Sequence, residues 1–284
     1  MFYKIIAFFQ YLLPHHLLTA IINKLARIET RWFKNAMIKT IARNFGVNWS
    51  EALLTEPDDY KHFNEFFTRQ LKPGVRPLAT AEDALLCPVD GAISSFGSIR
   101  QGRIFQAKGQ NFSCQELLAD KAQADKFING EYITIYLSPK DYHRIHMPLS
   151  GQLRQMTHIP GRLFSVAPYT VDTIPRLFAR NERSAHHFST KYGDHALVLV
   201  GAMLVASMET VWHGVLNPPR ARQVKYFNYP AGETTLARGT EMGRFNMGST
   251  VILLLPENSL RWNPDLAAGR TVRMGESLGT LVSP

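Results

Sequence analysis

The chain has 284 residues, of which 45% are hydrophobic and 19% charged, a composition that excludes disordered and collagen-like proteins. Its 32 Lys and Arg residues outnumber its 23 Asp and Glu residues, so the formal net charge is +9. The longest uncharged apolar run, residues 196–208, is shorter than the roughly 18–20 residues that a membrane-spanning helix needs. Two cysteines, Cys87 and Cys114, are too few for a disulfide scaffold, and we expect both to be plain core residues.

The N-terminus resembles a signal peptide only in part. Lys4 precedes the apolar stretch Ile5–Leu13, but Gln10 interrupts this stretch and Pro14 follows it where a small-residue cleavage site would stand. We therefore expect that the N-terminus does not direct secretion.

The next segment has the pattern of an amphipathic helix with a basic side. Its apolar residues recur at helical spacing and share one face: Leu17, Leu18, Ile21, Ile22, Leu25, Ile28 and Trp32. Its basic residues fall on the other side: Lys24, Arg27, Arg31 and Lys34, continued by Lys39 and Arg43. The first 50 residues hold seven Lys and Arg against one acid, Glu29, which lies within the apolar arc.

This pattern predicts a region that lies in a membrane interface and meets anionic headgroups with its basic side chains. The alternative is an ordinary surface helix packed on the core. A nucleic-acid contact is disfavoured because none of the usual binding motifs accompanies the charge.

Beyond residue 60 the segments are mostly of β type, separated by Gly and Pro. Ser113 and Glu116 form a capping box that predicts a short helix. We expect a hairpin at 93–105 around Arg100-Gln101-Gly102, largely buried strands at 132–137, 196–200, 203–208 and 251–255, and a strand, glycine turn and second strand at 270–279. The sequence therefore predicts an α+β protein, with a helical, membrane-associating region at 1–60 and a mainly antiparallel β catalytic domain at 61–284.

Three short stretches contain side chains that could take part in catalysis. Asp90 stands beside a glycine ahead of a strand, His143 and His146 follow another strand, and Gly248-Ser249-Thr250 precedes an apolar run. Together they supply an acid, a base that is neutral near pH 7 and a hydroxyl. A serine hydroxyl becomes a good nucleophile when a histidine accepts its proton, and an acid can hold that histidine in the right tautomer.

Two reactions fit these groups. A serine hydrolase would use Asp90, His146 and Ser249 as a triad, although no Gly-x-Ser-x-Gly elbow surrounds Ser249. Alternatively, Ser249 attacks the carbonyl of Gly248, which has no side chain to shield it, and the chain cuts itself.

The sequence resembles the bacterial phosphatidylserine decarboxylase family, whose members are pyruvoyl-dependent and are made as self-cleaving proenzymes. The family's cleavage motif is Leu-Gly-Ser-Thr, and this chain has Met247 in place of the leucine, a volume-conserving change. The other matching segments lie in the family's order between about residues 60 and 255: Phe63–Phe67, Asp90-Gly91, Tyr142–Pro148, Pro160–Val166, Phe178–Arg183 and Glu209–Trp212. The first 50 residues match the family only in character.

The resemblance implies that His146, oriented by Asp90, takes the proton of Ser249, so that the chain is cleaved into residues 1–248 and 249–284. Ser249 then becomes a covalent pyruvoyl group, which forms a Schiff base with phosphatidylserine; release of carbon dioxide gives phosphatidylethanolamine. His143 would act in the decarboxylation, and Ser165 is a candidate for substrate binding.

In that step His143 would protonate the product carbon. An electron sink is needed because loss of carbon dioxide from an amino acid leaves a carbanion. The sequence contains neither a dinucleotide-binding glycine motif nor a metal-ligand cluster, so we expect no external cofactor and no metal.

The resemblance also implies partners and a location. We expect the two chains to stay together as a heterodimer, with a higher oligomer left open, and to bind phosphatidylserine in anionic membranes without contacting nucleic acid. The protein would be peripheral on the cytoplasmic face of the cell membrane. The alternatives left open are a serine hydrolase, a pyruvoyl decarboxylase of another amino-acid head group, and a membrane or nucleic-acid binder without enzymatic activity.

Overall fold

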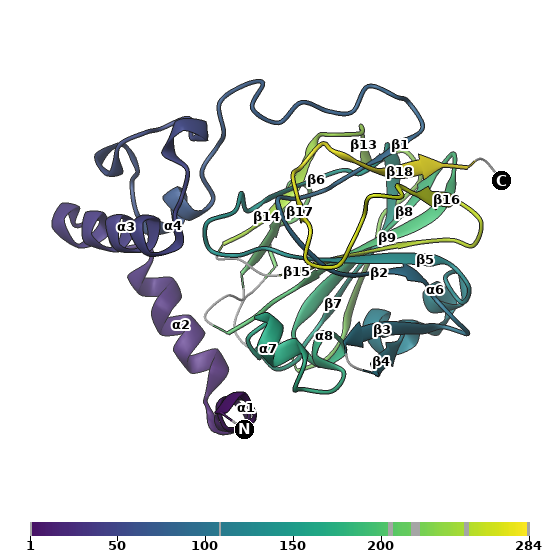
Figure 1. The fold of residues 1–284 in the computed structure, drawn as a ribbon, viewed down its shortest axis with the longest axis horizontal. Helices are drawn as coiled ribbons and strands as arrows, with labels where there is room; N and C mark the ends of the chain where they lie inside the picture. Colours follow the sequence, from purple (N-terminus) through teal and green to yellow (C-terminus); the bar gives the residue numbers. More distant parts are fainter. Residues whose placement is uncertain (1, 108, 204–206, 217–221, 247–249, 283–284) are drawn as a thin grey trace.

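The structure is a computed structural model that describes residues 2–107, 109–203, 207–216, 222–246 and 250–282. A group of helices at the N-terminus lies beside a β-rich body (Figure 1). This arrangement confirms the predicted α+β class. Among the described residues, no helix has the length and apolar character needed to cross a membrane.

The helical region consists of short elements rather than one long amphipathic helix. Its members are Phe2–Leu12 (α1), His15–Leu25 (α2), Arg31–Phe45 (α3), the 3-10 turns Trp49–Glu51 (η1) and Pro57–Asp59 (η2), and Phe63–Phe67 (α4). Residues 26–30 separate α2 from α3, so Leu17 and Trp32 lie on different helices. The prediction of a single apolar face from Leu17 to Trp32 is therefore wrong. Glu29 lies in this connection, where it pairs with Lys61 at 3.4 Å instead of interrupting an apolar face.

Lys34 was expected among the headgroup-binding residues, and this expectation is also wrong. Its side chain is buried, and its ammonium group donates to the carbonyl oxygens of Pro57 and Tyr60 at 2.9 and 2.6 Å. Lys34 thus fastens α3 to the turn that follows it. Around this contact the helical region has its own small core, which extends past residue 60 into α4: Ala26, Ile38, Ala42, Val47, Tyr60, Phe63, Phe66 and Phe67.

The β-rich body is built on a sheet that has nine strands among the described residues. Along the sheet the order is β12, β7, β8, β9, β15, β5, β2 and β17, and β13 also pairs with β7. All of these pairings are antiparallel. The strands are Gly91–Ser98 (β2), Glu131–Tyr136 (β5), Gly151–Ile159 (β7), Arg183–Thr190 (β8), Gly193–Val200 (β9), Lys225–Asn228 (β12), Thr235–Leu236 (β13), Thr250–Leu255 (β15) and Thr271–Val272 (β17).

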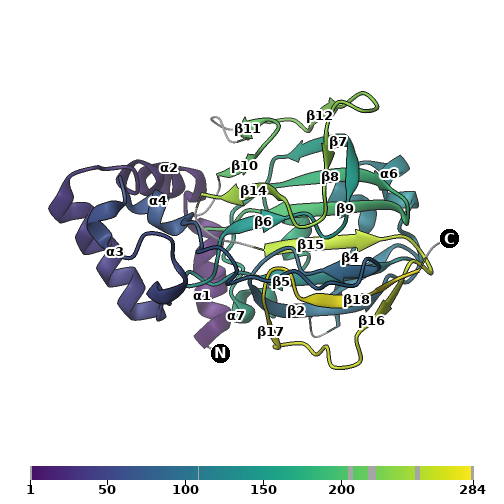
Figure 2. The same cartoon turned by 90° about the horizontal axis from the view of Figure 1, so that it is seen from above.

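Smaller sheets and helices cover the two faces of this sheet (Figures 1 and 2). The smaller sheets contain Ala84–Leu86 (β1), Leu260–Trp262 (β16) and Ser277–Leu281 (β18); Arg144–His146 (β6), Met208–Thr210 (β10), Gly214–Val215 (β11) and Glu241–Phe245 (β14); and Arg103–Ala107 (β3) with Gln110–Ser113 (β4). The helices of the body are Cys114–Leu118 (α5), Lys121–Asp125 (α6), Pro168–Val171 (α7) and Leu177–Arg180 (α8).

The strand β15 lies in the middle of the large sheet, between β9 and β5. Its side chains alternate between the two faces: Val251, Leu253 and Leu255 join one core, whereas Ile252 and Leu254 join the other. A strand buried on both faces should be continuously apolar, which is the pattern that predicted it. The predicted strands at 132–137, 196–200 and 251–255 are confirmed within one to three residues at each end.

Other local predictions had mixed outcomes. The capping box of Ser113 and Glu116 is present at the start of α5, and residues 270–279 contain β17, a turn at Gly275 and the first part of β18. The turn predicted at Arg100-Gln101-Gly102 is confirmed, because Arg100 and Arg103 form an antiparallel bridge around it. The paired strands predicted on either side of it are wrong, because β2 pairs with β5 and β17 while β3 pairs with β4. Of the strand predicted at 203–208, residues 204–206 lie outside the described residues, and β10 begins at Met208.

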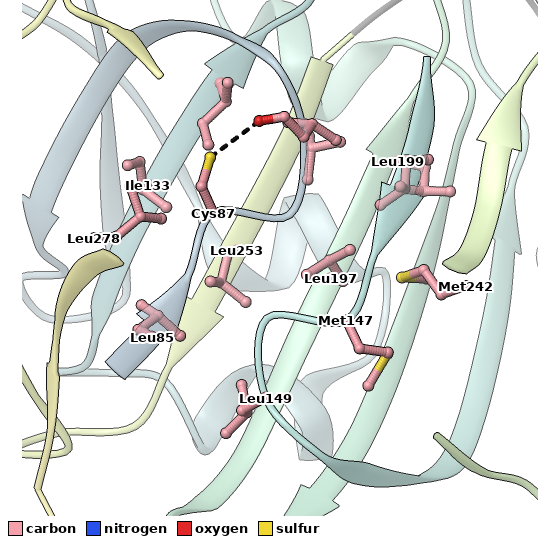
Figure 3. Close-up of a cluster of buried hydrophobic side chains, with 14 of the residues drawn as sticks. Leu85, Cys87, Ile133, Met147, Leu149, Leu197, Leu199, Met242, Leu253 and Leu278 are labelled. Carbon is pink, nitrogen blue, oxygen red and sulfur yellow. Dashed lines mark hydrogen bonds between the residues drawn. The ribbon is translucent and has the colours of Figure 1, made fainter. Parts of the chain in front are cut away.

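Both cysteines belong to the apolar core. Cys87 lies among the leucine and methionine side chains on one face of the large sheet, and its Sγ donates to the carbonyl oxygen of Val89 at 3.0 Å (Figure 3). Burial raises the pKa of both thiols, to about 12 for Cys114. Both are therefore protonated near pH 7, as expected of inert core residues.

Candidate active site

Several of the predicted catalytic segments lie at one end of the strands of the large sheet. Its register aligns Ala92, Tyr136, Thr250, Val200 and Arg183 in one row across five neighbouring strands. Asp90 lies two positions before Ala92, and the described part of β15 begins at Thr250, so Asp90 and the start of β15 lie at the same end of the sheet. With strands about 4.8 Å apart, β2 and β15 are about 10 Å from each other.

The four-stranded sheet brings the histidines to the same place. Its strand β6 pairs with β14, with Arg144 opposite Arg244, and the N–H of Phe245 donates to the carbonyl oxygen of His143 at 3.1 Å. The histidine segment therefore runs beside the strand that leads to the expected cleavage site. Gly248 and Ser249 themselves, with Met247, lie outside the described residues.

The Asp90 carboxylate is held by Arg76. Nε and Nη2 of Arg76 donate to it at 2.5 to 3.1 Å, and the backbone N–H of Met274 donates to Asp90 Oδ1 at 2.9 Å. Arg76 also donates to Glu51 at 2.7 Å. Among the described residues, no hydrogen bond joins Asp90 to His146; Asp90 acts on that histidine through its charge, which favours the imidazolium form.

Neutral groups hold the His146 ring. Its Nδ1 lies 2.8 Å from the carbonyl oxygen of Gly239, so Nδ1 must carry the proton and Nε2 the lone pair. The hydroxyl of Tyr142 lies 3.0 Å from Nε2, and burial raises the pKa of this phenol, so Tyr142 donates. Burial also lowers the pKa of His146. The ring is therefore neutral, and Nε2, which accepts the hydrogen bond of Tyr142, is the ring atom that can take up a proton.

His143 is more deeply buried and is held differently. Its Nδ1 donates to the carbonyl oxygen of Asp141 at 2.8 Å, its ring packs on Phe67 with centroids 4.1 Å apart, and its Nε2 has no hydrogen-bond partner among the described residues. Burial lowers its pKa to about 3. The guanidinium of Arg69, also buried, donates to the carbonyl oxygen of Lys140 at 2.7 Å and has Nε and Nη1 unpartnered in the described part of the chain.

Ser165 lies at the same end of the strands, in the loop that follows β7. Three strand spacings separate β7 from β15, or about 14 Å. The N–H of Ser165 donates to Oε1 of Gln10 in α1 at 2.9 Å, and His15 accepts the N–H of Leu163 at 3.2 Å. The N-terminal helices therefore contact the loop that carries this candidate residue.

Several residues of the site were not singled out from the sequence: Arg69, Arg76, Tyr142, Asn64 and Asn246. Tyr142, Asn64 and Asn246 lie inside or beside the segments that carried the resemblance or the candidate chemistry, so their positions were available but their partners were not. Arg76 has no local pattern that marks it. Its role arises from an ion pair with a residue 14 positions away.

Comparisons with known proteins identify the family. A family model described as phosphatidylserine decarboxylase matches residues 63–280, and a second model, described as PSD, matches residues 5–46. The chain belongs to the phosphatidylserine decarboxylase family. Relatives named phosphatidylserine decarboxylase proenzyme include one from Pseudomonas putida strain F1, 54% identical with 96% of each chain covered. Others come from Azotobacter vinelandii, 52% identical over 95% of this chain and 96% of the relative, and Methylococcus capsulatus, 48% identical over 98% and 97%. Membership of the phosphatidylserine decarboxylase family thus extends over nearly the whole length of the chain.

Proposed function

We propose that the protein cleaves itself between Gly248 and Ser249 and that the product decarboxylates phosphatidylserine to phosphatidylethanolamine. The observation that carries this proposal is that Asp90, the partly buried neutral His146 and the start of β15 at Thr250 lie at the same end of the strands. The name of the relatives, proenzyme, supports a processed product.

In the first stage His146 is the base. Its Nε2 accepts the proton of the Ser249 hydroxyl, the oxygen attacks the carbonyl carbon of Gly248, and the C–N bond breaks as the amine takes the proton. β-Elimination then removes the α proton of residue 249 and breaks its Cβ–O bond, so that Gly248 leaves as the terminal carboxylate of the large chain and dehydroalanine remains on the small chain. Water hydrolyses the imine form of this residue, which liberates ammonia and leaves a pyruvoyl group at position 249. The charge of Asp90 stabilises the imidazolium form of His146 during the proton transfer.

The residues around position 249 fit a pyruvoyl group. Thr250 is completely buried in the row of sheet residues, so the first atoms of the small chain are attached to a fixed strand. Such a group supplies the electron sink that decarboxylation of an amino acid requires. His143 Nε2, which has no hydrogen-bond partner in the described part of the chain, is the atom that would pass a proton to the product carbon. Burial lowers the pKa of His143 to about 3, so the ring is neutral near pH 7 and would carry that proton only transiently.

The small chain, residues 249–284, should remain bound after cleavage. Its strand β15 pairs with β9 and β5, β17 pairs with β2, and β18 pairs with β1. All four of these partner strands belong to residues 1–248. Burial of each large apolar side chain of β15 contributes about 2 kcal/mol. The product is therefore a heterodimer in this proposal, and its assembly into a higher oligomer stays a prediction.

The helical region supports binding to the cytoplasmic face of an anionic cell membrane. Phe8, Phe9, Leu12, Leu17 and Ile21 are all exposed on α1 and α2, and Lys24 and Arg27 lie exposed at the end of α2. Exposed apolar side chains beside basic ones suit an interface of acyl chains and anionic headgroups. Gln10 and His15 contact the Ser165 loop, so the exposed apolar side chains of α1 and α2 belong to helices that reach the end of the strands where the candidate site lies.

Intact mass under denaturing conditions tests the proposal. The purified protein should give fragments of residues 1–248 and 249–284, the smaller with a blocked N-terminus, and Ser249→Ala should give the full-length mass. A single uncleaved wild-type chain that still hydrolyses esters would instead identify a serine hydrolase. Release of carbon dioxide from vesicles containing phosphatidylserine, compared with vesicles containing a different amino-acid lipid, distinguishes the head group.

A further inference from the structure

Two buried asparagines connect the helical region to the residues just before the cleavage site. Nδ2 of Asn64, in α4, donates to Oδ1 of Asn246 at 3.0 Å, and both side chains are buried. Asn246 immediately follows β14 and stands two positions before Gly248.

The orientation of the Asn246 amide follows from its other partners. Its Nδ2 donates to Glu209 Oε2 and to Ser207 Oγ, both at 3.2 Å. Glu209 pairs with Arg244 at 2.5 Å, which lowers the pKa of its carboxyl group. An ionised carboxylate only accepts hydrogen bonds, so the NH2 group of Asn246 must face Glu209 and its oxygen must face Asn64.

The backbones of both residues are fixed as well. The N–H of Asn246 donates to the carbonyl oxygen of Ser207 at 2.8 Å, and the N–H of Asn64 donates to the carbonyl oxygen of Ala26 at 2.9 Å, at the end of α2. On the far side of the cleavage site, Thr250 is held between Tyr136 and Val200 in the large sheet. The three residues 247–249 therefore connect two anchored points.

We propose that Asn64 and Asn246 form a clamp that positions the Gly248 carbonyl for attack by Ser249. This inference rests on the self-cleavage proposed above and adds two positioning residues to it. Attack requires the hydroxyl oxygen to approach the carbonyl carbon to about 3–3.5 Å in the right direction, and a misplacement of about 1 Å can slow such a step on the order of 100-fold. Without the bond to Asn64, Asn246 is held only by its bonds to Ser207 and Glu209, and it stands two residues before that carbonyl.

A pulse-chase measurement on the full chain tests the clamp. The chain is labelled during cell-free translation, and cleavage is followed on denaturing gels. Asn64→Ala and Asn246→Ala should each slow cleavage about 10- to 100-fold, and the double variant should be no slower than the slower single variant, because both remove the same contact. Asn64→Asp replaces the donating Nδ2 with a carboxylate oxygen that faces Oδ1 of Asn246, and it should slow cleavage similarly. Asn263→Ala is the matched control: Asn263 donates to the carbonyl oxygen of Ser277 at 2.8 Å in the small chain, and its loss should leave the rate within twofold of wild type.

Unfolding is separated from positioning by repeating the substitutions in the uncleavable Ser249→Ala chain. Asn64→Ala in that background should remain fully folded at the temperature of the cleavage assay, so that slower cleavage by this variant reports positioning rather than unfolding. Cleavage at the wild-type rate in the clamp variants, or slowing that is multiplied in the double variant, would overturn the clamp while leaving self-cleavage intact. A wild-type chain that remains uncleaved would overturn the proposed function itself.

Discussion

Several large apolar side chains are exposed in the helical region, whereas those of β15 in the β-rich body are buried. In the helices, Phe8, Leu12 and Leu17 are 62%, 67% and 53% exposed, whereas every side chain of Val251–Leu255 in β15 is at most 1% exposed. Leucine occurs in both regions, so residue type alone does not explain the difference. A hydrogen-bonded strand on each side and an apolar core on each face bury β15, while α1 and α2 each leave one side uncovered.

This contrast indicates a division of labour. A strand that must stay in place after its chain is cut needs pairing and packing on both sides, and β15 has both. A surface that meets a membrane reversibly needs apolar side chains that remain accessible. Four predictions test this division, beginning with the largest expected effect.

Removing the base should affect maturation most strongly. His146→Gln should slow self-cleavage at least 100-fold, since general-base catalysis typically contributes about 10²–10⁴-fold. Asp90→Asn should slow it less, because Asp90 acts through its charge. His143→Ala should mature into two chains but decarboxylate poorly. Denaturing gels and carbon dioxide release measure the two steps, and His213→Gln, an exposed histidine, is the control. Normal cleavage by His146→Gln would remove this residue from the mechanism.

The same truncation should have different costs in the two regions. Leu253→Ala leaves a cavity in the core and should lower the free energy of unfolding by about 2–5 kcal/mol. Leu17→Ala, at an exposed position, should change it by no more than about 0.5 kcal/mol. Urea unfolding of both variants in the Ser249→Ala background avoids differences in maturation. Equal losses would contradict the assignment of Leu17 to an uncovered surface.

The β-rich body should be sensitive to acid because it buries neutral histidines. Burial lowers the pKa of His186 and His195 to about 3 and that of His187 to about 4. The unfolded chain binds their protons near pH 6.5, so stability is complete above that pH and falls as the pH drops towards 4, by up to about 1.4 kcal/mol per pH unit for each histidine. His195→Phe keeps the stacking on Phe188 and should make this decline shallower. Urea unfolding between pH 7.5 and 4.5 measures it, and an unchanged slope would argue against the assignment.

Membrane binding should depend on the helical region alone. Leu17→Asp with Ile21→Asp should weaken co-sedimentation with anionic vesicles about tenfold, through lost burial of apolar surface. Val211→Asp with Val215→Asp is the matched control, since these β-region side chains are similarly exposed. Lys24→Glu with Arg27→Glu should weaken binding mainly at low salt, because salt screens the attraction. Equal loss in the control pair would place the membrane contact elsewhere.

Local pattern was sufficient for features whose stabilising contacts are near in sequence or whose burial is uniform. The continuous apolar run 251–255 predicts a strand buried on both faces, and the capping box of Ser113 and Glu116 closes over three residues. The candidate groups Asp90, His143, His146 and Ser249 were selected by residue type and by the resemblance. Their chemistry belongs to the side chains themselves, so the sequence was enough to name them.

Tertiary structure decided which partners these residues have. Lys34 is indistinguishable from Lys24 in a helical pattern, yet three backbone carbonyls from residues 57–60 enclose Lys34 and leave Lys24 exposed. Asp90 was expected to hold His146, but Arg76 holds Asp90, while Gly239 and Tyr142 hold the ring. Asn64 and Asn246 meet across 182 positions. Such contacts depend on how distant segments pack against one another, and a local pattern contains no record of that packing.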